Sequence, residues 1–214
     1  MEAEIKLTND LIEICKQRIQ PYACEGFLLG GGNSQSKILF VGEAPGRQEL
    51  IDGVPFSGKA GKVLDQYFEW LGIAKSEVYI TSVVRSRPYK DNKQVLNKPI
   101  ESRGNRTPTQ AEIRAHAPLL DALIEDISPS IIVTLGGIAL RRLTNNRESL
   151  IDIHGRSFEG PILRLKSLDS NRYELTKSSY TIFPTFHPAS VFYNQRLKAN
   201  IEQDMQTLKE MLKA

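Results

Sequence analysis

The stretch from Lys37 to Gly61 combines glycines with carboxylates in a pattern that can build a ligand site. Residues 38–41 form an apolar run without alternation, which is typical of a strand covered on both faces of a parallel sheet. Gly42 to Gly46 ends this run and carries Glu43, and Glu49 follows. Ligands of open α/β sheets bind beyond the carboxyl ends of the strands, where glycines let bare backbone approach them. We therefore expect the chemistry of this protein at this loop, with two carboxylates beside it.

Two other interpretations of this stretch stay open from the residues alone. Gly42 to Gly46 can be an ordinary strand-to-helix turn. Gly53 to Ala60 nearly fits the phosphate-binding pattern G-x-x-x-x-G-K-[ST]. Ala60, however, has no hydroxyl for Mg²⁺, and the preceding Arg47 to Asp52 is polar where that motif needs a buried strand. The residues favour the phosphate-binding loop least.

The elements that must position this loop can be predicted from periodicity. Helical spacing predicts helices over residues 4–20, 59–70, 109–128, from 136 through 143, and 197–212. Apolar runs predict strands at residues 38–41, 78–84, 130–135 and 180–184. Residues 158–180 read as a hairpin at one edge. Strands that alternate with helices imply an α/β fold, a single three-layer domain with a central four-stranded parallel sheet flanked by helices.

Composition and length are ordinary for one globular domain. The chain has 214 residues, of which 40% are hydrophobic and 25% charged, so we expect a single domain over residues 1–214 and a monomer. The sequence has no apolar stretch of transmembrane length and no signal-peptide pattern, which predicts a cytoplasmic location and no membrane partner. Cys15 and Cys24 have no C-x-x-C spacing, so they predict neither a disulfide framework nor a closed metal site.

Three ordered motifs carry a resemblance to a known family. The first is G-E-A-P-G with Glu49 and G-V-P-F-S-G-K-A-G-K-V-L-D; the second joins Tyr79 to Pro88 with Gly104 to Thr109; the last runs from Phe183 to Ser190. Together they resemble the motifs of the family 4 uracil-DNA glycosylases and cover most of the chain from about Lys37 onward. The resemblance implies a four-stranded parallel sheet between helical layers, in agreement with the strand count above.

The resemblance also implies roles for individual residues. Phe56 matches the family's stacking aromatic, and His187 would donate a hydrogen bond to a base oxygen as negative charge develops there. Glu43 or Glu49 would position the water, and we favour Glu49, although either can instead bind backbone amides of the loop. Periodicity alone favours a core position for Phe56, and a loop histidine is often structural. The other base-binding candidates are Gly42, Ala44 and Ser82.

Two departures from the family bear on this prediction. The family usually has an asparagine where this chain has Ser82, whose hydroxyl reaches less far, so we expect weaker discrimination of uracil. The family also carries an iron–sulfur cluster on four cysteines. Cys15 matches the first of these positions, and the others hold Arg18, Ser86 and His116. Because most of the thiolates are missing, we predict no cluster, no metal and no other cofactor.

The basic segment from Arg85 to Arg106 predicts contact with a phosphate backbone. It holds seven basic and two acidic residues, a net charge of +5, whereas the whole chain has +3. A long solvated loop without a ligand is the other interpretation. The predicted DNA contacts are Arg85, Arg87, Arg103, Arg106 and, from the last motif, Ser190.

Two functions of different classes follow. The first is a DNA N-glycosylase of base-excision repair, which flips uracil or another deaminated base out of DNA and hydrolyses its N-glycosidic bond. The alternative is a catalytically weak or inactive nucleic-acid-binding member of the same fold, in which Ser82 has abolished excision. The retained G-E-A-P-G loop, Glu49, Phe56 and His187 favour the enzyme, with damaged DNA as its partner and no obligate protein partner.

Overall fold

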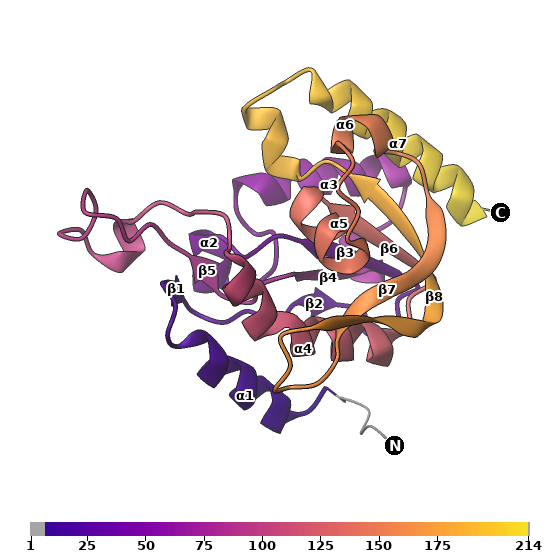
Figure 1. The fold of residues 1–214 in the computed structure, drawn as a ribbon. Helices are drawn as coiled ribbons and strands as arrows, with labels where there is room; N and C mark the ends of the chain where they lie inside the picture. Colours follow the sequence, from indigo (N-terminus) through magenta and orange to yellow (C-terminus); the bar gives the residue numbers. More distant parts are fainter. Residues whose placement is uncertain (1–6, 214) are drawn as a thin grey trace.

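The computed structural model describes residues 7–213, and helices cover both faces of one central sheet (Figure 1). The strands are β1 Cys24–Glu25, β2 Gly31–Gly32, β3 Ile38–Gly42, β4 Tyr79–Ser82, β5 Arg87–Pro88, β6 Ile131–Leu135, β7 Phe158–Leu165 and β8 Tyr173–Thr185. The α-helices are α1 Asn9–Ile19, α2 Arg47–Asp52, α3 Lys59–Leu71, α4 Gln110–Ile127, α5 Gly137–Thr144, α6 Leu150–Ile153 and α7 Leu197–Lys213. Short 3₁₀ helices are η1 Lys75–Glu77, η2 Ile100–Ser102 and η3 Pro188–Phe192. The predicted three-layer α/β architecture is confirmed.

The central sheet has six strands in the order β2-β4-β3-β6-β8-β7. Its four inner strands run parallel, as predicted, and β2 and β7 join antiparallel at the two edges. The prediction kept the edge hairpin apart from the fourth parallel strand, but β8 runs unbroken through 13 residues and serves as both. The prediction also lacks β2, because Gly31–Gly32 has no side chains to produce a strand pattern.

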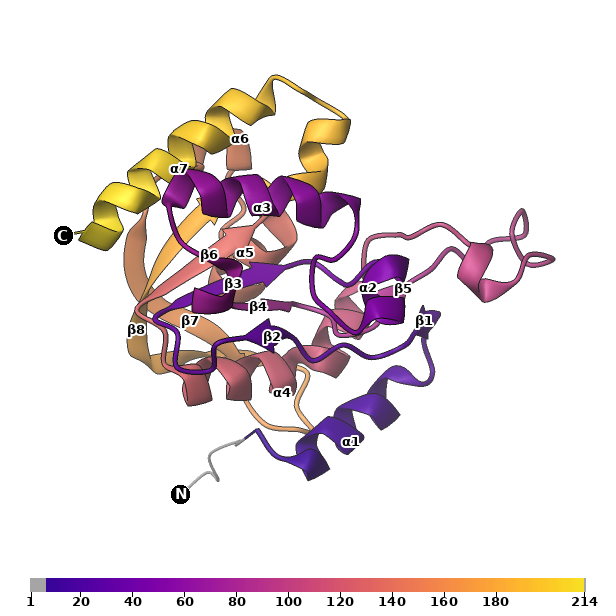
Figure 2. The same cartoon turned by 180° about the vertical axis from the view of Figure 1, so that it is seen from behind.

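Alternate side chains of the parallel strands face the two helical layers. Leu39 and Val41 of β3 pack in the cluster formed with α4 and α5, whereas Phe40 packs with α3 and α7 on the other face. All three are fully buried, which explains why the run shows no alternation of polar and apolar residues. α1 lies outside α4 and packs on it through Leu11 and Cys15 (Figure 2).

Helix boundaries follow local signals where such signals exist. Thr109 caps α4, its hydroxyl accepts from the Glu112 N–H, and the Glu112 carboxylate accepts from the Thr109 N–H, so the predicted capping box is confirmed. α3 ends at Gly72, whose φ of 75° is left-handed. α1 begins later than predicted because Thr8 caps it; residues 4–6 of that prediction lie outside the described residues.

The first motif contains a helix that the sequence analysis treats as a polar loop. α2 spans Arg47–Asp52, and Glu49 rather than an apolar stripe stabilises its start. Because a helix and not a strand precedes Gly53, the segment from Gly53 to Ala60 does not form a phosphate-binding loop of the G-x-x-x-x-G-K-[ST] kind.

The basic segment forms an arm, residues 89–105, that projects from the body of the molecule (Figures 1 and 2). An isolated antiparallel bridge between Tyr89 and Asn105 closes its root. β5 leads into the arm and pairs with β1, a two-residue interaction that carries no periodicity and was not predicted.

No helix within residues 7–213 is long and apolar enough to cross a membrane.

Candidate functional site

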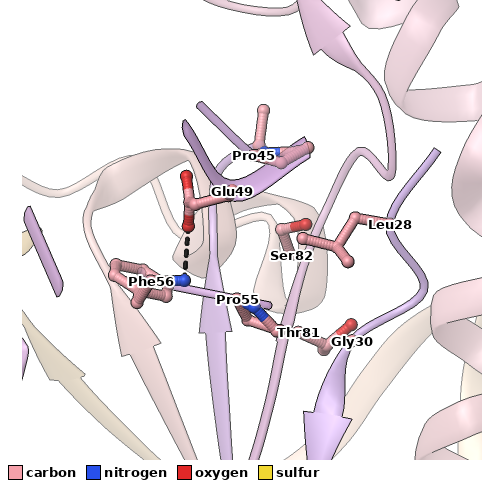
Figure 3. Close-up of a pocket in the computed structure, with 9 residues that line it drawn as sticks. Leu28, Gly30, Pro45, Glu49, Pro55, Phe56, Thr81 and Ser82 are labelled. Atoms are coloured by element: carbon pink, nitrogen blue, oxygen red, sulfur yellow. Dashed lines mark hydrogen bonds between the residues drawn. The ribbon is translucent and has the colours of Figure 1, made fainter. Parts of the chain in front are cut away.

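A pocket lies at the carboxyl ends of β3 and β4, where the first and second motifs meet (Figure 3). Gly42 and Ser82 end these two parallel strands in register, so the residues after them leave the sheet at the same place. The pocket is lined by Leu28, Gly30, Ala44, Pro45, Glu49, Pro55, Phe56, Thr81 and Ser82. Four of these, Ala44, Glu49, Phe56 and Ser82, are residues that the sequence analysis names.

The pocket is nearly closed in this conformation. Its volume is about 10 Å³, roughly the space of one water. A planar base therefore enters only when the lining side chains move apart, and Leu28 and Phe56 are the large apolar side chains among them. The neighbouring space bounded by Gly31, Val54 and Pro55 is larger, about 410 Å³, and shares Gly30 and Pro55 with the pocket.

Phe56 is held in an unusual backbone conformation. Its φ of 52° is left-handed, which is rare for a bulky residue and is maintained only where surrounding contacts enforce it. Its N–H donates to Glu49, and its carbonyl accepts from Lys75 Nζ at 3.1 Å. A Cβ at Gly61 would lie 1.7 Å from that carbonyl oxygen, so glycine is required there. The ring lies against Gly42, where a Cβ would stand 3.1 Å from its edge.

Glu49 organises the loop rather than presenting a free carboxylate. One carboxylate oxygen accepts from the Gly46 N–H and the other from the Phe56 N–H, the bond dashed in Figure 3. The sequence analysis favours Glu49 as the residue that positions water. In the structure Glu49 also has the other role named for it, that of binding backbone amides, one through each carboxylate oxygen, and its role in positioning water stays a prediction.

Glu43 is the other carboxylate of the first motif, and it is half-buried outside the wall of the pocket. Burial raises the pKa of Glu43, and the positive charge of Arg141 on α5 opposes that rise. Within the described residues its carboxylate has no hydrogen bond from the protein. Of the two carboxylates of the motif, Glu43 is therefore the one with all of its lone pairs open to a water.

His187 follows β8 and lies beside Phe56, with ring centroids 5.7 Å apart and the planes tilted by 36°. Its Nδ1 accepts the Ala189 N–H at 3.1 Å and so caps η3. Burial lowers the pKa of His187 to about 4, so the ring is neutral at pH 7. Because Nδ1 is an acceptor, the proton of the neutral ring is on Nε2. His187 is therefore a neutral hydrogen-bond donor through Nε2.

Ser82 is buried at the floor of the pocket, and its hydroxyl donates to the Val84 carbonyl at 2.8 Å. The hydroxyl has one proton, so this bond leaves only oxygen lone pairs for a ligand. Thr81, also in the lining, donates its hydroxyl to the Leu29 carbonyl. Towards a base, the end of β4 therefore presents an acceptor and no side-chain donor.

The predicted phosphate contacts of Arg85 and Arg87 are wrong, because these side chains are 0% and 1% exposed. Arg87 holds the root of the arm. Its guanidinium pairs with Glu25 and donates to three groups on the second half of the arm, Ile100 O, Arg103 O and Asn105 Oδ1. Arginines in a basic segment are expected to be exposed to solvent. Only the tertiary structure shows that Arg85 and Arg87 are buried.

The other two predicted arginine contacts, Arg103 and Arg106, are also engaged within the protein. Arg106 forms two hydrogen bonds with the Glu112 carboxylate, at 2.6 and 2.9 Å, and Arg103 donates to carbonyls within the arm. The Ser190 hydroxyl is buried and has no partner among the described residues. The exposed cations of the arm are the lysines Lys90, Lys93 and Lys98.

The positions that the resemblance assigns to an iron–sulfur cluster do not fit one. Cys15 is fully buried, and burial raises the pKa of its thiol to about 11, so it is not a thiolate. Arg18 donates to three backbone carbonyls, those of Arg114, Ala115 and Leu168. Among residues 7–213 no group of three or more His, Cys, Asp or Glu side chains could hold a metal ion. The donor set is cationic and neutral, whereas a cluster needs thiolates.

Several pocket residues carry no signal in a single sequence. Leu28 and Gly30 precede β3 by several residues and reach the pocket because that loop crosses the end of β4. Pro55 has a local signal, since it precedes Phe56 in the first motif. Contacts of this kind depend on how loops cross in space.

A crevice at the carboxyl ends of parallel strands is where three-layer α/β proteins bind ligands, and an aromatic ring beside a neutral imidazole donor suits a flat polar ring such as a nucleobase. The chain belongs to the uracil-DNA glycosylase superfamily, because residues 29–211 match the family described as "Uracil DNA glycosylase superfamily".

Individual relatives agree with this assignment. A protein of Saccharolobus solfataricus named "Type-4 uracil-DNA glycosylase" is 35% identical over 188 residues, which cover 86% of this chain and 74% of that protein. A protein of the same name from Sulfurisphaera tokodaii is 32% identical over 216 residues, 99% of this chain and 86% of the relative. Another, from Archaeoglobus fulgidus, is 32% identical over 187 residues, 86% of this chain and 81% of its own length.

Proposed function

We propose that this protein is a DNA N-glycosylase of base-excision repair, which flips a deaminated base from DNA and hydrolyses its N-glycosidic bond. The observation that carries the proposal is His187, a neutral Nε2–H donor placed beside the aromatic ring of Phe56. The three relatives described above are each named "Type-4 uracil-DNA glycosylase", which supports the same reaction class.

The catalytic step needs a donor that strengthens as the bond breaks. When the bond between C1′ of the sugar and the base nitrogen cleaves, the electron pair stays with the base, and negative charge spreads to the carbonyl oxygens of the base. The Nε2–H of His187 stabilises that charge more than it stabilises the neutral substrate, which is the condition for lowering the barrier. A neutral imidazole does this without first losing or gaining a proton.

A water molecule completes the hydrolysis. Its oxygen adds to C1′, one proton remains on the new sugar hydroxyl, and the other balances the departing base. Glu43 is the residue we assign to orient this water, because its carboxylate is half-buried and accepts no hydrogen bond from residues 7–213. Glu49 acts through Phe56, since it holds the backbone of that residue in the left-handed conformation.

Ser82 predicts which bases are accepted. Its oxygen offers lone pairs to the pocket, so it accepts a hydrogen bond from a ring N–H. Deamination creates such a group in two cases: uracil has an N3–H and hypoxanthine an N1–H where cytosine and adenine have a lone pair. Xanthine keeps the N1–H that guanine already has. Ser82 therefore favours deaminated bases over cytosine and adenine, but it offers no donor to a base oxygen and discriminates weakly among them.

DNA affinity is assigned to the arm. Lys90, Lys93 and Lys98 are exposed on a segment that projects from the body of the molecule, and the arginines give this segment its shape. Ammonium groups on such an arm bind phosphates without reading sequence. The monomeric state and the cytoplasmic location stay predictions.

The experiment that tests the function is single-turnover excision from oligonucleotides that each carry uracil, hypoxanthine or xanthine, with matched cytosine and adenine oligonucleotides as controls. We expect release of at least one deaminated base and none of the controls, and Glu43→Gln should slow release while leaving DNA affinity unchanged. DNA binding without release of any base would favour the nucleic-acid-binding alternative.

A further inference from the structure

A second group of polar side chains lies buried near α1 and α4, in the segment that follows β4, and has no role in the base pocket. It comprises Arg85, Ser86 and His116, each at most 1% exposed. All three guanidinium nitrogens, the hydroxyl and both ring nitrogens lack a hydrogen-bond partner among the described residues. Nearly all buried polar groups in folded proteins are hydrogen-bonded, so this concentration needs an explanation.

Arg85 is the group that most needs a partner, because it carries five N–H donors and a charge. Burial lowers the pKa of Arg85 to about 10, which leaves it charged at neutral pH. Asp121 is near enough to affect it electrostatically, but that carboxylate accepts from Arg142 and from the Leu165 N–H. Cys15 affects it too, and its raised pKa keeps it a neutral thiol. No acidic side chain of the described chain therefore accepts a hydrogen bond from Arg85.

His116 contributes a neutral donor to the same region. Burial and, to a smaller extent, the positive charge of Arg85 lower the pKa of His116 to about 3, so the ring is neutral and interacts electrostatically with Arg85. One ring nitrogen of the neutral imidazole carries a proton. Arg18 also acts on this ring, but its guanidinium is already bonded to backbone carbonyls.

We propose that Arg85, His116 and the Ser86 hydroxyl bind a small monovalent inorganic anion such as chloride. The charge matches, because Arg85 is the guanidinium here whose N–H donors have no partner among the described residues, and one negative charge neutralises it, while the histidine is neutral. The chemistry also matches, since a halide accepts several hydrogen bonds and has no proton that would need an acceptor in the site. The anion takes the region that the family resemblance assigns to a cluster, which the residues here do not fit. This inference does not depend on the catalytic function.

The anion would anchor one wall of the base pocket and the root of the arm. Arg85 lies between Ser82 and Arg87 in the chain, and its carbonyl accepts from the N–H of Leu28, a residue of the pocket lining, at 2.7 Å. Fixing the Arg85 side chain therefore fixes the backbone on which both features depend.

The direct test is crystallography with bromide, which replaces chloride and scatters anomalously. Wild-type crystals soaked in sodium bromide should show an anomalous peak within hydrogen-bonding distance of the Arg85 guanidinium and of His116, and Arg85→Met should lose that peak. Ordered water without an anomalous peak at Arg85, or peaks confined to the molecular surface, would overturn the proposal.

Thermal melts provide the test in solution. Chloride replaces gluconate at constant ionic strength, and the melting temperature of the wild type should rise with the logarithm of chloride concentration. His116→Phe, which keeps an aromatic ring beside Phe27, should reduce this dependence, and Arg85→Met should abolish it. Arg156→Met removes an exposed charge and should retain the full dependence. Equal chloride dependence in the wild type, Arg85→Met and His116→Phe would refute anion binding here.

Discussion

Replacing His187 by alanine should lower the excision rate much more than the affinity for DNA. The substitution removes the Nε2–H donor and also frees the Ala189 N–H that Nδ1 accepts. Loss of one donor of this type lowers the rate about 10²–10³-fold, or roughly 3–4 kcal/mol of transition-state stabilisation. Freeing a partly buried backbone N–H costs about 1–3 kcal/mol of folding free energy, so the melting temperature should also fall.

The pH profile distinguishes the neutral donor from a charged one. Since burial lowers the pKa of His187 to about 4, the ring stays neutral from about pH 5 upward and the rate should not fall as the pH rises through 6.5. A charged imidazolium donor would lose about tenfold in rate per pH unit above its pKa. An acid limb is expected from Glu43, whose pKa burial raises, and it should vanish in Glu43→Gln. Stability has the same sign: the unfolded chain binds a proton between about pH 6.5 and 4 that the folded His187 does not, so stability falls as the pH drops.

The assay is single-turnover release of a deaminated base, normalised to the folded fraction, with DNA affinity and thermal melts measured in parallel. His154→Ala is the matched control, because His154 bonds Asp204 at 2.7 Å and packs on Phe186 outside the base pocket. It should reduce stability and leave the rate per folded molecule unchanged. If His187→Ala and His154→Ala gave the same rate as the wild type, the assignment of His187 to catalysis would be refuted.

Three further predictions follow from the site and the arm. Ser82→Asn should raise uracil excision relative to other deaminated bases by about 10–100-fold, corresponding to roughly 1–3 kcal/mol for a restored amide hydrogen bond; an unchanged profile across the base panel would remove Ser82 from recognition. Replacing both Lys93 and Lys98 with alanine should lower the slope of log K against log salt by about two on duplex DNA, whereas an equal slope in a salt titration would place the phosphate contacts elsewhere. Gly61→Ala should destabilise the fold by at least about 1–3 kcal/mol, because its Cβ would lie 1.7 Å from the Phe56 carbonyl oxygen, and a melting temperature equal to that of the wild type would contradict the enforced conformation of Phe56.

The parallel core could be predicted because its signal is local. β3 and β6 are buried, mostly apolar runs, and α4 starts at a capping box formed by Thr109 and Glu112. α2 could not be predicted from apolar spacing, since it buries none of its residues and is stabilised by a single carboxylate. β2 gave no pattern because glycine has no side chain to pattern.

Pocket residues could be predicted where they belong to a motif at or just after the end of a strand. They could not be predicted where they belong to a loop from another part of the chain. Ser82 and Ala44 belong to the first kind and Leu28 to the second. The roles of charged residues were the hardest to predict, because a charge indicates exposure unless its partners are known. The partners of Arg87 are Glu25 and residues in the second half of the arm, at separations of up to 62 positions that no local pattern encodes.

The closure of the arm by Arg87 affects how the sequence of the arm can vary in evolution. A single side chain joins the residue before the arm to three positions at its far end, so the length of chain between Tyr89 and Ile100 is decoupled from the body of the fold. Doubling a flexible loop costs only about 0.6 kcal/mol of closure entropy. Insertions, deletions and new charges at the tip are therefore nearly neutral for stability. Under the proposed function, mutations there would change how far the arm reaches along DNA without disturbing the chemistry at the sheet.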